Sequence, residues 1–208
     1  MIEGQFDSIL DDNRTVFFIE GENYADLSGL SNGENIKEVV LENSIVDHEH
    51  MEKILKLERL ERISFVDCSV LAWESLNKLH VKELLLNRCK IEDTFYLEIE
   101  GLISLYLDAC EEVDLERIPV IRGLKELSLS QTHVKNGECF VYMNAIQKLR
   151  LDGSGVEDLS FCMVLDKLKY LVVDEEQVNK NREIIQELIR KGIDVVDAGA
   201  RRVVMYNE

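Results

Sequence analysis

Apolar residues recur along this chain in a fixed frame, which is clearest between Val81 and Ile91. In that stretch, VKELLLNRCKI, Leu84 and Leu86 are separated by one residue, and the small Cys89 follows Leu86 after two more. Copies of the frame begin at residues 36, 60, 81, 102, 124, 146 and 168, so successive copies start 21 to 24 residues apart. A nearly constant period in this range predicts a repeat protein in which each unit supplies one strand and one returning segment.

Each predicted strand has two faces with different roles, because successive side chains point to opposite sides of a sheet. Leu84 and Leu86 therefore point to one face, and Leu85 points to the other. Strands of successive units stack in parallel about 4.8 Å apart, and their inward leucines bury one another in ladders. The 208 residues would allow one domain or two small ones, and the continuous repeat favours one elongated domain.

Both ends of the ladder need caps, because an uncovered end unit would expose apolar side chains and unpaired backbone groups. Residues 1–35 are predicted to form the N-terminal cap, either as a hairpin of the runs FDSIL and TVFFI or as one degenerate unit. Seven repeats are expected in residues 36–178. Residues 179–208 are predicted to form the C-terminal cap, in which a helix over Glu175–Lys191, ended by Gly192, leads to a final strand, IDVVD.

Two features of the returning segments are also predicted. Asp47 is placed to cap a short helix in the longest return, where Met51 and Ile54 fall at helical spacing. The frame slips by one residue near Glu111-Glu112-Val113, where a local bulge is expected.

The pattern L-x-x-L-x-L-x-x-C-x-[IV] resembles that of the leucine-rich-repeat superfamily over residues 36–197. The period of about 22 residues is similar to the short-repeat, internalin-like and SDS22-like classes. This resemblance implies an α/β fold, a curved solenoid with a parallel β-sheet on its concave face and short helical, 3₁₀ and loop returns on its convex face. It also implies that proteins bind on the concave face. These repeats commonly carry asparagine where this chain has small residues, namely Ser44, Cys68, Cys89, Cys110, Thr132 and Ser154.

The open face of the predicted sheet holds the candidate binding residues, because the core does not require their side chains. Its middle column reads Val40, Ser64, Leu85, Tyr106, Ser128, Arg150 and Val172. The residues selected as the protein-binding site are Leu85, Tyr106, Val66, Asp108, Arg150, Asp152, Tyr170 and Asp174. Aromatic and aliphatic anchors ringed by polar groups are typical of protein interfaces, so we expect Leu85 and Tyr106 to be anchors. Asp108 and Asp152 are expected to steer a basic partner, and an ordinary soluble face with scattered apolar residues is the alternative.

The net charge of −17 at pH 7 favours a protein partner with a basic surface and argues against nucleic acid or an anionic membrane. The chain has no apolar run long enough to span a membrane and no signal-peptide pattern at its N-terminus. Its five cysteines are odd in number and form no C-x-x-C pair, which favours the cytoplasm. A monomer is expected.

Catalytic, cofactor and metal sites are not predicted. Cys68, Cys89 and Cys110 follow the repeat period, so they are interpreted as buried small residues rather than as a metal or redox site. In Asp47-His48-Glu49-His50 the two imidazoles do not share a helix face, which favours a solvated helix start over a metal site. No catalytic or nucleotide-binding motif is present.

The sequence therefore predicts a non-catalytic interaction module that acts as an adaptor, an inhibitor or an immunity-type protein. A secreted or cell-surface recognition module of internalin-like kind is the alternative. An enzyme is considered only if a pocket with perturbed titratable groups exists.

Overall fold

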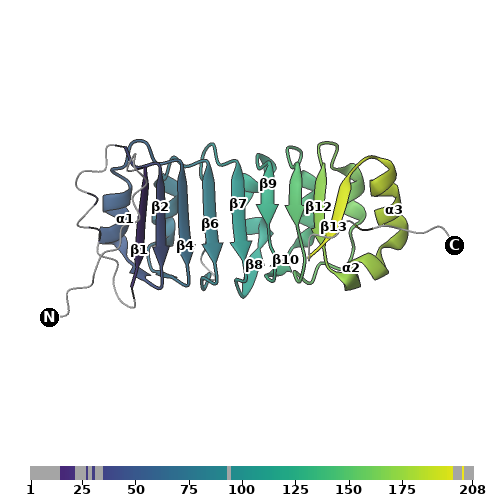
Figure 1. Ribbon diagram of the computed structural model, residues 1–208, viewed down its shortest axis with the longest axis horizontal. Coiled ribbons are helices and arrows are strands. Elements are labelled where there is room, and N and C mark those ends of the chain that lie inside the picture. Colours follow the sequence, from purple (N-terminus) through teal and green to yellow (C-terminus); the bar gives the residue numbers. More distant parts are fainter. Residues whose placement is uncertain are drawn as a thin grey trace.

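The computed structural model describes residues 15–21, 27, 30, 35–92, 95–198 and 203, without the side chains of residues 120 and 121. Within this part of the chain, nine strands form one parallel sheet in which every strand lies beside its predecessor in the sequence (Figure 1). The strands are β1 (Val16–Glu20), β2 (Glu38–Glu42), β4 (Arg62–Val66), β6 (Glu83–Asn87), β7 (Ser104–Asp108), β9 (Glu126–Ser128), β11 (Lys148–Arg150), β12 (Tyr170–Val173) and β13 (Asp194–Asp197). One strand per unit in a parallel ladder confirms the leucine-rich-repeat solenoid.

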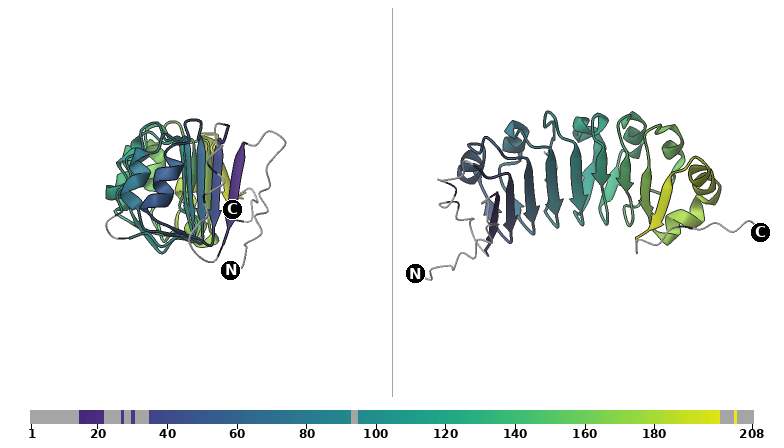
Figure 2. Two further views of the ribbon diagram at one scale, coloured as in Figure 1. Left: turned by 90° about the vertical axis from the view of Figure 1, so that its left-hand side faces the viewer. Right: turned by 45° about the horizontal axis from the view of Figure 1, so that its top comes forward.

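The returning segments cover one face of the sheet and leave the other face open. Figure 2 shows the strands on the inner side of the arc and the helical turns on its outer side. The helical segments are α1 (His48–Ile54), η2 (Trp73–Lys78), η3 (Leu115–Arg117), η4 (Pro119–Arg122), η5 (Gly137–Tyr142) and η6 (Ser160–Val164). Two short parallel pairs lie among them, β3 (Ile45–Val46) with β5 (Ser69–Val70) and β8 (Glu112–Asp114) with β10 (His133–Lys135).

The cap of α1 is the one that the sequence predicts. Asp47 accepts hydrogen bonds from the backbone N–H groups of Glu49 and His50, and it carries the extended backbone of an N-cap residue. These bonds satisfy two donors that the first turn of a helix leaves free.

The strand phase is confirmed by the register. Leu84 and Leu86 of β6 are both fully buried, and each lies opposite an inward residue on the strands at either side. Leu85 lies between Ser64 and Tyr106 on the open face and is only half-buried. The core is therefore a set of continuous ladders that run along the solenoid, and no unit could bury its leucines without its neighbours.

The column of small residues after each strand lies inside the turn that leads away from the sheet. The residue before each of them has a positive φ, as in Arg88 (φ 51°) before Cys89 and Gln131 (φ 55°) before Thr132. The side chain then donates a hydrogen bond to a strand carbonyl of the preceding unit. Cys89 Sγ donates to Phe65 O at 3.4 Å, and Thr132 Oγ1 donates to Leu107 O at 2.6 Å. This column therefore has the structural role that the sequence predicts for it.

The thiols of this column are not poised for chemistry. Burial raises the pKa of Cys89 to about 12 and that of Cys110 to about 11, so both stay protonated at neutral pH. Cys162 is also buried, whereas Cys139 is half-buried. All five cysteines are free, and no described group of three or more His, Cys, Asp or Glu side chains could hold a metal ion.

At the N-terminal end, the run TVFFI supplies β1, which pairs in parallel with β2 and extends the ladder. Residues 6–10, the other strand of the predicted hairpin, lie outside the described part of the chain. The boundary at residue 35 stays a prediction.

At the C-terminal end, the sequence predicts one helix, but the structure has two, α2 (Glu175–Lys180) and α3 (Arg182–Arg190), on either side of Asn181. The Asn181 side chain bonds the backbone of the preceding unit, accepting from Leu159 N at 3.0 Å and donating to Glu157 O at 2.7 Å. The backbone of Asn181, with φ −120° and ψ 31°, is not helical and interrupts the helix. The predicted final strand is present as β13, and the N–H of Val203 donates to Val195 O.

The frame slip near Glu112 lies in a turn. Residues paired between β7 and β9 are 22 apart in the sequence, whereas those paired between β8 and β10 are 21 apart. The extra residue therefore falls between the end of β7 and the start of β8, and neither pairing is interrupted by the bulge that we expected.

Candidate protein-binding face

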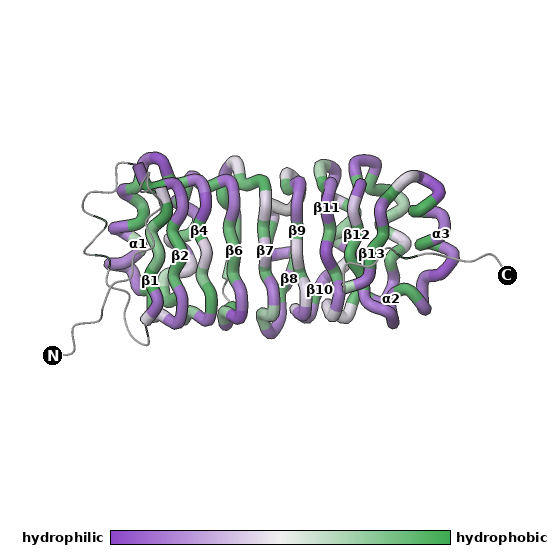
Figure 3. Tube along the Cα trace, viewed as in Figure 1, coloured by the Kyte–Doolittle hydropathy of each residue, from purple (hydrophilic) through white to green (hydrophobic). Residues whose placement is uncertain are grey.

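The open face of the sheet carries one continuous middle column. Its members, each in register with the next, are Phe18, Val40, Ser64, Leu85, Tyr106, Ser128, Arg150, Val172 and Val196. The first five strands of the main sheet are β1, β2, β4, β6 and β7, written β1–β7 below. On these strands the column is apolar or aromatic apart from Ser64, and its four large side chains are half-buried. Figure 3 shows the apolar stretches through the middle of these strands and the polar β11 beyond them.

Sequence reasoning found part of this row and missed the rest. Leu85 and Tyr106 are direct register partners, and Val66 lies on the neighbouring strand one column away. Phe18 was missed because its unit lacks the repeat frame, although it lies 22 residues before its partner Val40. Extending the period by one unit upstream would have found it.

The side chain of Tyr106 is held in place by its hydroxyl group. Its hydroxyl donates to Glu126 Oε2 at 2.9 Å, and Glu126 also accepts from Lys148 Nζ at 2.8 Å. Burial and the adjacent carboxylate raise the pKa of Tyr106 to about 12, so the phenol stays protonated. An aromatic side chain fixed in this way loses little rotamer freedom when a partner covers it.

Carboxylates flank the apolar row on both sides. Glu38 and Glu83 lie in the column before it, and Glu20, Glu42 and Asp108 lie in the column after it.

Arg62 is the one basic side chain on the five strands β1–β7 of the main sheet, all of whose residues the structure describes. It lies 3.0 Å from a carboxylate oxygen of Glu83 and 3.5 Å from one of Glu38. Carboxylates therefore outnumber cations on this half of the open face.

The predicted acidic row of Asp108, Asp152 and Asp174 is not a row of free charges. Asp152 is only 4% exposed and accepts from Arg150 Nε at 2.6 Å and from Ser130 Oγ at 2.8 Å. The expectation that Asp152 steers a partner needs correction, since a buried, paired carboxylate projects little field. A carboxylate withdrawn from water needs such donors.

The other two members of that row also have structural partners. Asp108 accepts from Ser128 Oγ at 2.5 Å and from Ser130 N at 3.1 Å. Asp174 caps α2 by accepting from Gln177 N at 2.8 Å, and it also accepts from Gly153 N at 2.9 Å.

The pKa values of two of these carboxyl groups move in opposite directions. Burial raises the pKa of Asp108 above its ordinary value, in spite of its hydrogen bonds from serine. Burial also opposes ionisation of Asp152, but the hydrogen bonds from Arg150 and Ser130 outweigh it and lower the pKa.

The eight predicted site residues thus fall into two groups. Val66, Leu85, Tyr106 and Asp108 lie together on β4–β7. Arg150 and Tyr170 lie on β11 and β12, Asp152 is the second residue after β11, and Asp174 directly follows β12.

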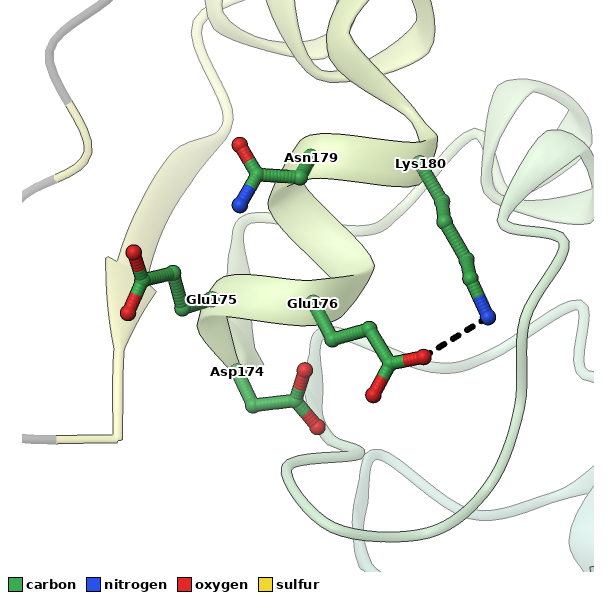
Figure 4. A pocket seen from close by; sticks show the side chains of 5 residues that line it. All are labelled: Asp174, Glu175, Glu176, Asn179 and Lys180. Carbon is green, nitrogen blue, oxygen red and sulfur yellow. Dashed lines mark ion pairs between the residues drawn. The ribbon is translucent and has the colours of Figure 1, made fainter.

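Acidic side chains line an open depression beside α2, near the C-terminal end of the solenoid (Figure 4). It is lined by Asp174, Glu175, Glu176, Asn179 and Lys180. Lys180 Nζ lies 2.7 Å from Glu176 and 2.9 Å from Glu157, and these carboxylates raise its pKa. Lys180 therefore stays a cation at neutral pH and is unsuited to act as a base.

The histidines at the start of α1 also have local roles. His50, expected to be solvated, is 8% exposed, and its Nδ1 lies 2.6 Å from Asp47 Oδ1 in the helix cap. His48 is exposed and lies 3.4 Å from Glu74.

Comparison with known proteins shows the fold of this chain. No protein-family model matches the sequence, and no curated protein matches it either. The structure is similar to an internalin (inlF) from Listeria monocytogenes, with a TM-score of 0.60 and 18% identity over 83% of this chain and 51% of that one. It is also similar to internalin C2 (inlC2) from the same organism, with a TM-score of 0.55 and 16% identity over 80% of this chain and 72% of that one.

These similarities show that this chain has the leucine-rich-repeat solenoid fold of both neighbours. The chain spans about half the length of the first neighbour. In the described part of the chain, no helix is both long and apolar enough to cross a membrane.

Proposed function

We propose that this leucine-rich-repeat solenoid is a non-catalytic module that binds another protein on the concave, open face of its sheet. The row formed by Phe18, Val40, Leu85 and Tyr106 is the observation that carries the proposal. These side chains face away from the core and so contribute less to folding than the inward leucines, yet they form an apolar strip, interrupted by the small Ser64 and ringed by polar groups. Contiguous apolar strips with a polar rim are characteristic of protein interfaces.

The partner is proposed to carry a basic surface. The net charge of −17 attracts a cationic protein over a distance of about one Debye length, roughly 8 Å at physiological salt. The carboxylates beside the apolar row act on the same kind of partner at contact distance. An adaptor, an inhibitor or an immunity-type protein would use such a face in the same way.

We place the protein in the cytoplasm, on the ground that its five cysteines are all free, and we propose that it is a monomer. The fold shared with two internalins favours a second candidate, a secreted or cell-surface recognition module. Thiol quantification in protein freshly isolated from its own host separates the two. Complete reduction supports the first, and oxidised cysteines support the second.

The binding proposal is tested by capturing a partner with the full chain and then measuring kinetics on variants. Tyr106→Ala should raise the dissociation rate by a factor that corresponds to about 2 kcal/mol or more, because a central aromatic anchor is lost. The melting temperature should change little, since Tyr106 lies outside the core ladders.

Tyr142→Ala is the matched control, because Tyr142 is an aromatic residue that is 51% exposed in η5 on the convex side. It should bind as the wild type does. Equal loss of binding in both variants, or wild-type kinetics in Tyr106→Ala, would refute binding through the concave face.

A further inference from the structure

The open face has two halves that differ in charge and in the partners of their charged groups. On β1–β7 it presents five carboxylates and one guanidinium around the apolar row. On β9–β12 the charged groups pair with one another, Lys148 with Glu126 at 2.8 Å and Arg150 with Asp152 at 2.6 Å. Only the first half combines surplus charge with apolar surface.

The surplus in the first half rests on particular carboxylates. Glu42 is half-buried and Glu20 is exposed, and no ion pair joins either of them to a described residue. Arg88, which is ion-paired with Asp67, also interacts electrostatically with Glu42. Arg62 divides its single charge between Glu38 and Glu83. A cation brought by a partner would therefore meet carboxylates that the fold has not already neutralised.

The geometry of this half-face is regular. The carboxylate columns lie two residues to either side of the apolar column, which is about 6.7 Å along the strands. From β1 to β7 the apolar column crosses five strands, or about 19 Å, which is the length of a helix of about 13 residues. The 5.4 Å pitch of an α-helix is close to the strand spacing of about 4.8 Å, so each helical turn meets about one strand.

We propose that the β1–β7 half of the open face binds an amphipathic basic helix of the partner, laid across the strands. This inference rests on the proposed function and adds the class of partner. An apolar stripe on the helix contacts Phe18, Val40, Leu85 and Tyr106, and lysine or arginine residues on both sides of the stripe reach the two carboxylate columns.

The other half of the face disfavours the same helix. Exposed lysines precede strands in both halves, Lys37 and Lys82 before β2 and β6 and Lys125 and Lys169 before β9 and β12, so they do not distinguish the halves. Lys148 on β11 is paired with Glu126. Ser128 and Ser130 are buried and offer no apolar anchor. This half therefore offers a basic helix neither a surplus of carboxylates nor an apolar row, and we expect the helix to bind on β1–β7.

The experiment uses the full chain and three synthetic peptides of about 18 residues, long enough to cross the five strands as a helix. The first has a leucine and phenylalanine stripe at helical spacing with lysine on both sides of it. The second carries glutamate in place of every lysine, and the third has the composition of the first in an order without a stripe. Binding is measured by fluorescence anisotropy at low and at physiological salt.

The basic striped peptide should bind at least about tenfold more tightly than either of the others, and it should weaken as salt is raised. Glu42→Lys should weaken it by about tenfold at low salt. Val40→Ser should weaken it at both salt concentrations, because the contact it removes is apolar. Glu175→Lys, the same charge change at an exposed position in α2, is the matched control and should have little effect.

Stronger binding of the acidic peptide, equal binding of the peptide without a stripe, or no binding by any of them would overturn the inference. So would equal effects of Glu42→Lys and Glu175→Lys. If a captured partner depends on Tyr106 but not on Glu42, the proposed function stands and the basic helix is refuted. If the captured partner depends on neither, the concave site itself fails.

Discussion

The two faces of the sheet use adjacent residues for different purposes. On the inner face of β6, Leu84 and Leu86 are fully buried between the equivalent residues of two neighbouring units. On the open face Leu85 is half-buried, and the hydroxyl of its neighbour Tyr106 donates a hydrogen bond to Glu126. Stability therefore depends on one set of columns and the proposed recognition on the next, so side chains of the open face can change without loss of the fold.

The largest difference between the faces is expected from removing one leucine on each. Leu86→Ala should lower the free energy of unfolding by about 2–5 kcal/mol, because it leaves a cavity between Phe65 and Leu107. Leu85→Ala should lower it by much less, since no enclosed cavity forms on the open face. Urea denaturation of both variants measures the contrast.

Equal destabilisation by these two variants would show that the open face belongs to the core of the folded protein. It would also undermine the separation of stability from recognition that the proposed function needs.

A smaller effect is expected from the hydrogen bonds inside the turn column. Thr132 Oγ1 donates to Leu107 O and accepts from Cys110 N at 3.0 Å, and all three groups are buried. Thr132→Val keeps the shape but leaves both backbone groups without their partner, so it should cost about 1–3 kcal/mol in thermal or urea unfolding.

Thr132→Ser retains the hydroxyl and is the control for that loss. If Thr132→Val is as stable as Thr132→Ser, the hydroxyl is dispensable and the column is held by packing alone.

The smallest effect should come from a charged pair on the open face and should depend on pH. Because the pKa of Asp152 is lowered, its ionised form stabilises the fold at neutral pH, and this contribution is lost as pH falls below about 4. Asp152→Asn should therefore destabilise the protein by roughly 1 kcal/mol at pH 7 and by less at low pH. Urea unfolding of wild type and variant at both pH values gives the two differences.

The pKa of Asp108 is shifted in the opposite direction to that of Asp152, so its effect on stability should depend on pH in the opposite sense. Its pKa is raised, so the ionised form is the costly one, and its contribution to stability becomes more favourable as pH falls through the raised value. Asp108→Asn should therefore not reproduce the pH dependence of Asp152→Asn. The same pH dependence in both variants would contradict the assigned directions.

The comparison of the faces also explains which features the sequence could predict. Leu84, Leu86 and Cys89 were assigned to the core because each is repeated at the same place in several units. A position that recurs with the period meets the same neighbours in every unit, so the pattern itself specifies the contact. Leu85 and Tyr106 could be predicted as open-face residues because the same strand phase places their column opposite the inward leucines.

Other features depend on polar contacts between particular side chains of adjacent units, which no repeating pattern specifies. From the sequence Asp152 is expected to be an exposed charge, but in the structure it is buried and accepts a hydrogen bond from Ser130 of the adjacent unit. The helix at the C-terminal end is interrupted because Asn181 bonds the backbone near Glu157 in the preceding unit.

The sequence by itself determined the period, the strand phase, the inner ladders and the turn column of this protein. These follow from spacing, because apolar residues at fixed intervals have only one face on which to be buried. Only the tertiary structure decided that β1 extends the apolar row to Phe18 and that the carboxylates of β1–β7 remain largely unneutralised while those beside β11 are paired. Charge pairing depends on distances of a few ångströms between side chains of different units, and those distances are set when the strands come into register.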